Sequence, residues 1–342
     1  MKKIPKSFQI LFTFIGLIVV LITGLISFVE WKGAGLLNQK IQEAIATECP
    51  TCHFQSENTE ISLFSSPHLK FSKITFVTKK PQGTNVDVQI DQLEAQLEFT
   101  PLLSHEIIFD LIEVEKPTIV LIDNDTLSPP SEKTDSSSWF FQVSKTNIKN
   151  GRFKYERDTH GTHANLKIHK INAELEAIDS TLNLKQPLLA RLSGQIEKSG
   201  NIDLNVSMKS LKKPLMIDVD LKAENQNLED LTPFFEENAG VILNGTLIRG
   251  RSVAKMRHDS VSATVSAEYQ DLTVALVKNY VRNEVSVFFS NLAANVVMAK
   301  KNQDKSLKDQ TSEVTALPQA GESIVGFFLR GMKEAALKVT RQ

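Results

Sequence analysis

The sequence contains little cysteine and no surplus of either charge. Two cysteines among 342 residues cannot form a disulfide framework that would hold a large domain together. Lys and Arg number 39 and Asp and Glu number 40, so the formal net charge is -1. The basic surface of a nucleic-acid-binding protein is therefore not expected. No Gly-x-Ser-x-Gly elbow, P-loop or dinucleotide fingerprint occurs, and we expect no nucleic-acid partner and no enzymatic activity.

Metal-binding and redox patterns are also weak. The histidines within residues 160–169 lack a carboxylate or a cysteine at ligand spacing, and Cys49, Cys52 and His53 would lack a fourth ligand for zinc. A redox role for the two cysteines would need a thioredoxin-like βαβ context, which the pattern does not show. In an oxidising compartment, a local disulfide between Cys49 and Cys52 is the favoured interpretation. We predict no catalytic residues, no metal and no cofactor.

The chain does contain a long apolar run, residues 8–29, which carries no charged side chain. At about 1.5 Å per residue the run is long enough to cross a hydrocarbon core of roughly 30 Å. Lys2, Lys3 and Lys6 precede it, so the positive-inside rule places the N-terminus in the cytoplasm. A cleaved signal peptide is the alternative, but its apolar region would span only about 7 to 15 residues. We predict a single-pass anchor in a bacterial inner membrane, with the bulk of the chain in the periplasm.

Beyond the anchor, the apolar residues recur mainly with a period of two. Val86, Val88 and Ile90 alternate with polar residues, and the same pattern occurs at 93–99, 171–177, 202–208 and 217–223. Alternation of this kind is typical of strands with one apolar and one solvated face, and many such strands predict a mainly β, antiparallel fold. The pattern fits an open curled sheet and a closed two-sheet sandwich equally well.

Two polar stretches and an amphipathic segment divide the chain further. Residues 125–138 are rich in Ser, Thr and Pro, residues 300–312 are rich in charge, and residues 322–339 have a helical apolar stripe. The expected sections are 1–32 (cytoplasmic stub and anchor), 33–125 (short helix and first β section), 126–139 (polar linker), 140–299 (second β section), 300–317 (charged linker) and 318–342 (amphipathic helix).

The order of motifs after the anchor resembles that of the AsmA family of inner-membrane-anchored envelope proteins. The resemblance is carried by residues 61–78 and by residues 90–122, with Pro101-Leu102-Leu103 as a turn and Pro117 before a last apolar strand. Residues 143–158 are similar to the family's strand, Asn-Gly turn and strand unit. Residues 228–250 resemble its Leu-x-Pro-Phe segment, which precedes a strand with a central glycine.

The resemblance implies a long antiparallel curled β-sheet with short terminal helices, whose apolar concave groove binds phospholipid and passes it between membranes. This chain is short for the family, so we expect a further partner, self-association or a local role. The alternative is a non-catalytic envelope assembly protein that binds a protein partner. The residues expected to line the groove are Ile202, Leu204, Val206, Ile217, Val219, Leu221, Val261, Val265, Val285, Val287 and Phe289.

Overall fold

The computed structural model describes most of residues 39–276 and one short segment beyond them. The described residues are 39, 41–43, 45–46, 49–62, 68–78, 84–98, 106–123, 140–159, 162–179, 186–210, 216–257, 260–276 and 311–312. Within these residues, no helix is both long and apolar enough to cross a membrane. The predicted anchor at 8–29, the polar linker at 126–139 and the C-terminal helix at 318–342 lie outside them.

Alternating strands make up nearly all of this part of the chain, as the period of two predicted. The first strands are β1 (Cys52–Ser62), β2 (His68–Thr78), β3 (Thr84–Glu98), β4 (Glu106–Glu115), β5 (Thr118–Asp123), β6 (Phe140–Thr159) and β7 (Thr162–Asp179). The later elements are β8 (Leu188–Ile196), β9 (Gly200–Ser210), β10 (Met216–Asn227), the 3-10 turn η2 (Leu228–Leu231), α3 (Thr232–Ala239), β11 (Val241–Arg257), β12 (Ser260–Leu276) and β13 (Thr311–Ser312). The fold is therefore mainly β.

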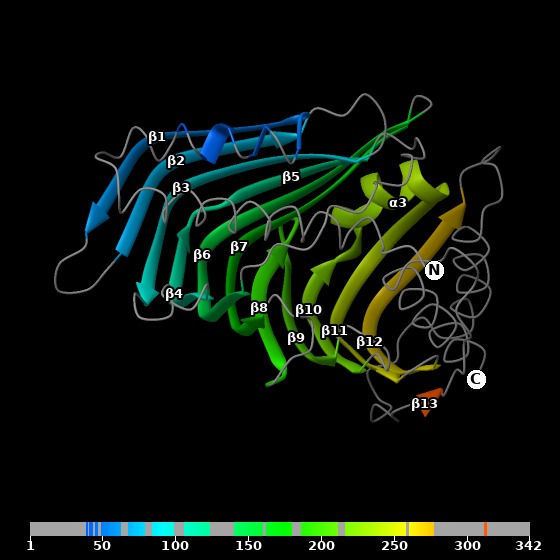
Figure 1. Cartoon of the computed structure of the whole chain (residues 1–342). Helices are drawn as coiled ribbons and strands as arrows, with labels where there is room; N and C mark the ends of the chain where they lie inside the picture. The colour runs from blue at the N-terminus through cyan, green and yellow to red at the C-terminus, as the bar shows by residue number, and fades with distance from the viewer. Residues whose placement is uncertain are drawn as a thin grey trace.

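All thirteen described strands belong to one sheet (Figure 1), in the order β1-β2-β3-β4-β6-β7-β8-β9-β10-β11-β12-β13. β4 and β5 act as one interrupted strand, because both pair with β3 on one side and with β6 on the other. The interruption is at Lys116-Pro117, where Lys116 has a φ of 48° and proline has no N–H to donate. The sheet is antiparallel among the described strands except where β4 and β5 run parallel to β6.

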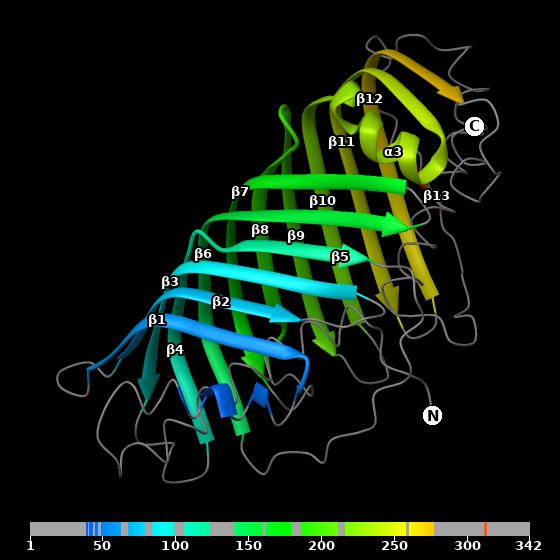
Figure 2. The same cartoon turned by 90° about the horizontal axis from the view of Figure 1, so that it is seen from above.

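A line of irregular residues crosses the sheet and folds it into two arms. Lys73 of β2, Lys116 between β4 and β5, and Asn150 of β6 have left-handed φ values, and Asp91 of β3 lies between the first two. An extra residue at such a bulge bends a strand and increases its twist. We call this line the crease. Figure 2 shows the strands bending sharply between the two arms.

The two arms differ in extent. The long arm includes 92–98 of β3, 140–149 of β6 and 251–257 of β11, and it is present on every strand from β1 to β12 except β5, which lies in the short arm. The short arm includes 84–90 of β3, 152–159 of β6 and 241–247 of β11. The predicted Asn150-Gly151 turn is wrong, because these residues lie at the crease in the middle of the continuous strand β6.

The apolar side chains face the inside of the bend. The largest core cluster covers the inner side of β1 to β4 and includes Ile41 and Ile45 of the short N-terminal helix, which are fully buried or nearly so. A second cluster lies on β10 to β12 around Met256, and a third joins Phe235 of α3 to Val241 and Leu243 of β11. The crease therefore turns one amphipathic sheet into an apolar inside and a polar outside.

Candidate functional site

The strand register aligns the inner apolar residues into rows that cross the whole sheet. The first row consists of Ile61, Leu69, Ala95, Ile112, Thr146, Leu175, Ala190, Val206, Val219, Ala254 and Ala263. The second row consists of Thr59, Phe71, Leu93, Val114, Ile148, Ala173, Leu192, Leu204, Leu221, Ser252 and Val265. Each row spans ten strand spacings, which is about 48 Å at about 4.8 Å per spacing.

Burial along these rows is not uniform. At the β1 end the second row is closed, with Phe71 1%, Leu93 7% and Val114 6% exposed. From β6 to β10 the members of both rows are only partly buried. At β11 and β12 the first row is buried again, with Ala254 0% and Ala263 3% exposed. We call the partly exposed stretch the open section; its apolar members are Ile148, Ala173, Leu175, Ala190, Leu192, Leu204, Val206, Val219 and Leu221.

Most of the predicted groove residues lie on this inner face. Val206 pairs with Val219 and Leu204 pairs with Leu221, so β9 and β10 bring four of them side by side in the open section. Four other predicted groove residues also lie on the inner face. Ile202, Ile217 and Val261 are buried, and Val265 is partly exposed. Val285, Val287 and Phe289 lie outside the described residues.

Sequence reasoning missed the contribution of the central strands. Ile148 of β6, Leu175 of β7 and Leu192 of β8 occupy the same rows as the predicted residues. The alternation at 171–177 already marked Leu175 as apolar-facing. Only the register shows that it shares a row with residues on β9 and β10, because cross-strand alignment is not encoded in local spacing.

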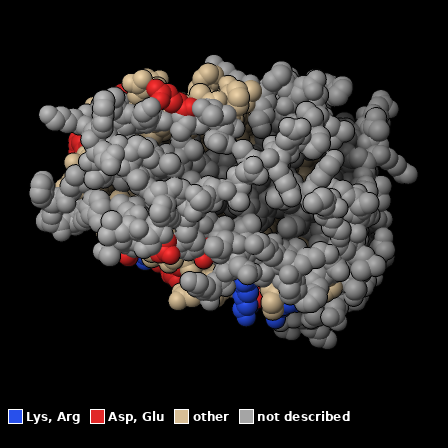
Figure 3. Space-filling view, viewed as in Figure 1, with Lys and Arg blue, Asp and Glu red and all other residues tan. Residues whose placement is uncertain are grey.

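The outer face is polar and held by ion pairs between strands. Arg251 forms a bidentate ion pair with Asp220, in which Nε donates to Oδ1 at 3.0 Å and Nη2 donates to Oδ2 at 2.9 Å. Nε of Arg249 lies 2.6 Å from Oε2 of Glu268. Lys145 pairs with Glu174 at 2.6 Å in the same way. Viewed as in Figure 1, the described charged side chains appear at the margins of the molecule (Figure 3).

The crease carries its own exposed charge row on the outside. Nζ of Lys73 lies 2.7 Å from Glu57, and Nζ of Lys116 lies 3.4 Å from Asp91. The hydrogen bond with Glu57, followed by its charge, raises the pKa of Lys73. Because these groups are exposed, we assign them a role in solvation and alignment of the bend rather than in binding.

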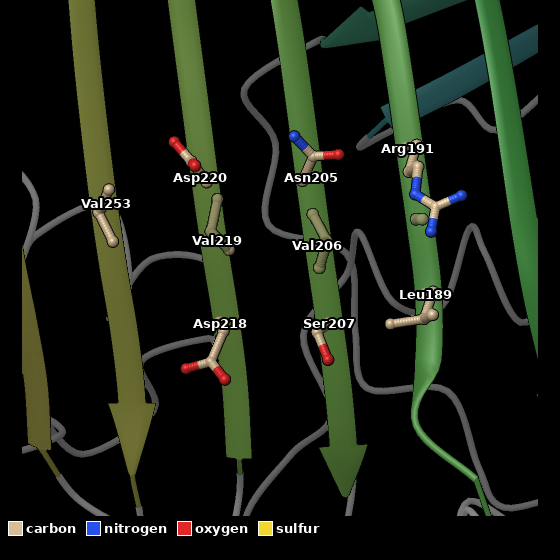
Figure 4. A pocket seen from close by; sticks show the side chains of 10 residues that line it. Leu189, Arg191, Asn205, Val206, Ser207, Asp218, Val219, Asp220 and Val253 are labelled. Atoms are coloured by element: carbon tan, nitrogen blue, oxygen red, sulfur yellow. The ribbon is translucent and has the colours of Figure 1, made fainter.

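One outer-face hollow of about 200 Å³ lies across β8 to β11 (Figure 4). Arg191, Asn205, Asp220 and Val253 line it from neighbouring strands. The hydrogen bond from Arg251, opposed by burial, lowers the pKa of Asp220. A carboxylate with a lowered pKa is a poor proton acceptor at neutral pH, so Asp220 is not an activated base.

The N-terminal end of the inner face is closed by a helix joined to β1 through a tight turn. Cys49 and Cys52 form a disulfide whose Cα atoms lie 5.3 Å apart. The backbone N–H of Cys49 donates to Ile45 O at 2.7 Å, and that of Cys52 donates to Cys49 O at 2.9 Å. Cys52 itself belongs to the core cluster with Ile41 and Ile45. The turn therefore holds the helix against the β1 end of the rows.

Two comparisons with known proteins found no match. No protein-family model matches the chain, and no curated protein matches it. Among the described residues, no group of three or more His, Cys, Asp or Glu side chains is placed to hold a metal ion. The open section of the inner face is thus the candidate site. It is an apolar surface, and the outer face of the same strands is polar and exposed to solvent.

Proposed function

We propose that this chain is an AsmA-like periplasmic protein, anchored by residues 8–29, that binds phospholipid acyl chains and passes them along the inner face. One observation carries the proposal. Two rows of apolar side chains cross the sheet in register, and between β6 and β10 their members are partly exposed instead of filling a closed core. A soluble globular sheet ordinarily buries such a surface.

The dimensions suit an acyl chain. From β6 to β10 the open section covers four strand spacings, or about 19 Å. Half of a hydrocarbon core of roughly 30 Å gives about 15 Å for the acyl region of one leaflet. An acyl chain lying along the rows would therefore fit within the open section, and hydrocarbon needs no fixed polar partner there.

The strength of binding favours passage over storage. If about 14 methylenes are half covered at about 0.8 kcal/mol each, one chain gains roughly 5–6 kcal/mol. An affinity of that size corresponds to a dissociation constant on the order of 0.1 mM, which permits rapid release. The rows reach about 48 Å, a fraction of a periplasm. We therefore propose transfer to a partner or a second copy instead of a full crossing by one chain.

The alternative function is assembly or scaffolding, with a protein partner in place of lipid. The observation that favours it is the eleven-residue edge strand β1, ten residues of which pair with β2 on one side in the described part of the chain. A long edge of this kind accepts an added strand from another protein.

Site-specific photocrosslinking in cells separates the two functions. We would replace Leu204, on the inner face, with p-benzoylphenylalanine in the full chain, and make the same change at its neighbour Asn205 on the outer face. The lipid proposal expects phospholipid adducts by mass spectrometry at Leu204 and none at Asn205. Protein adducts at both positions, with no lipid at either, would favour the scaffold instead.

A further inference from the structure

The short arm is interrupted between β7 and β11. β7 pairs with β8 only from Ile168 to Glu176, so its first residues, 162–167, have no strand on that side in the described structure. β11 pairs with β10 only from Thr246 to Arg257, so its residues 241–245 likewise have no described strand on the β10 side. β8, β9 and β10 end close to the crease, so among the described residues no strand forms the wall opposite the open section there.

The segment η2–α3 fills this interruption. Figures 1 and 2 both place α3 between the short-arm parts of β7 and β11. Its Phe234 ring lies edge-on to Tyr155 of β6, with ring centroids 6.1 Å apart. Phe235 packs with Val241, Leu243 and their neighbours on β11 and β12. α3 therefore stands where the wall of the short arm would otherwise continue.

Side-chain groups complete the strand edge that α3 covers. The Thr232 hydroxyl donates to Leu243 O at 2.7 Å and accepts from Leu243 N at 3.0 Å, so one side chain replaces a strand partner for both backbone groups. At the other end, the Ser199 hydroxyl donates to Asp230 at 2.7 Å. By contrast, β11 and β12 are joined by a ladder of fifteen residue pairs.

Because of this difference in attachment, the free energy needed to detach η2–α3 is expected to be lower than that needed to separate two paired strands. A ladder must break many backbone hydrogen bonds together, whereas a short helix held by side chains can detach as a small cooperative unit. Gly240 ends α3 with a left-handed φ of 63°, its N–H donates to Glu236 O at 2.8 Å, and β11 begins at the next residue, so one glycine forms the whole connection. At the start of η2, the side-chain oxygen of Asn227 accepts a hydrogen bond from the backbone N–H of Glu229 and caps the turn.

We propose that η2–α3 is a lateral gate through which an acyl chain enters and leaves the open section. The inference rests on the proposed lipid-binding function and adds the route of entry. When the segment swings away from β11, the interruption between β7 and β11 exposes the open section from the side. A chain then reaches its rows without being threaded past the closed β1 end.

Lipid exchange kinetics test the gate. We would replace Thr232 with valine, which keeps the shape and removes both hydrogen bonds to Leu243. Thr273→Val is the matched control: Thr273 lies on β12, is exposed, and accepts only the side-chain bond from Asn244 at 3.2 Å. The full chain in amphipol would receive fluorescent phosphatidylethanolamine from donor vesicles and lose it to unlabelled vesicles.

The expected result is an increase of about 30-fold in both the loading and the release rate of Thr232→Val, since two net hydrogen bonds of about 1 kcal/mol each are lost and about 1.4 kcal/mol corresponds to tenfold. The amount bound at saturation should not change, and the control should match the wild type. Equal rates in variant and wild type, with lipid bound normally, would overturn the gate while leaving the proposed function intact. No lipid bound by any of the three proteins would overturn the proposed function itself.

Hydrogen exchange on the unmodified chain is a second measurement that does not depend on a variant. Amides of residues 228–240 should exchange faster than those of β9 and β10, and their opening rate should limit the rate of lipid release. If these amides are as protected as those of β9 and β10, the segment does not open and the gate is refuted.

Discussion

The strongest prediction concerns Gly245 in the short-arm part of β11, where the register with β12 shifts between Asn244 and Thr246. This residue has a φ of 102°, a conformation that L side chains rarely adopt. A Cβ there would lie 2.6 Å from the carbonyl oxygen of Asp271 and 2.7 Å from that of Gln270. Both obstacles are backbone atoms of the paired strand β12, so a side chain cannot turn away to relieve the contact. Only a displacement of β11 relative to β12 would make room for the methyl group.

Gly245→Ala should therefore be strongly destabilising. A left-handed alanine costs about 1–2 kcal/mol and forced overlap about 1–3 kcal/mol, for a total of about 2–5 kcal/mol. At roughly 2–4 °C per kcal/mol, calorimetry on the full chain should show a midpoint lower by at least about 4 °C.

Gly250→Ala is the matched control on the same strand. Its Cβ would meet Leu247 at 3.4 Å and Ser266 O at 3.7 Å, which are ordinary contacts, and we expect a change within about 0.5 kcal/mol. Equal midpoints for the two variants would refute the claim that backbone crowding against β12 requires glycine at position 245.

Three further predictions test the faces and the N-terminal turn. Val219→Asp should reduce bound phospholipid at least about 30-fold, because covering a carboxylate with hydrocarbon costs several kcal/mol, whereas the outer-face control Ser262→Asp should retain lipid in the same extraction assay. Because the pKa of Asp220 is lowered in the folded state, its ionised carboxylate stabilises the fold at pH values above the ordinary pKa of an aspartate, and this contribution is lost as the pH falls. The difference in the free energy of unfolding between wild type and Asp220→Asn should therefore shrink below about pH 4 in acid titrations. Cys49→Ser should lower the free energy of unfolding by about 2 kcal/mol for a four-residue loop, and adding reductant to the wild type should reproduce the loss in denaturant midpoints.

Local alternation predicted the strands but not how they join. The runs at 86–90 and 93–99 were interpreted as two alternating segments, and the structure makes them one strand, β3, with the crease between them. The alternation changes phase between Ile90 and Leu93, both of which are buried. That one-residue phase change is the sequence signal of a bulge, which keeps the apolar residues on one face while the strand bends.

Other features depend on contacts that are distant in sequence and could not be predicted from spacing. The Asn150-Gly151 pair has the composition of a hairpin turn, but its neighbours on both sides continue in β6 against the interrupted strand β4–β5. The parallel pairing of β6 and the placement of α3 beside β7 likewise follow from long-range packing. The inner-face residues of β9 and β10 were predictable because strict alternation at 202–208 and 217–223 defines their faces locally.

The choice between an open groove and a closed sandwich changes along the molecule. At β2 to β4 both arms are present, the N-terminal helix fills the bend, and inner residues such as Phe71 are buried as in a packed core. At β8 to β10 the described residues form almost no short arm, and Leu192, Leu204 and Leu221 are partly exposed although they belong to the same row as Phe71. The same alternating pattern therefore gives a packed face where the N-terminal helix covers it and a partly exposed face from β6 to β10. The closed end supplies the stability that an open section of the same sheet lacks, and this division lets a single sheet fold while part of its apolar face remains accessible.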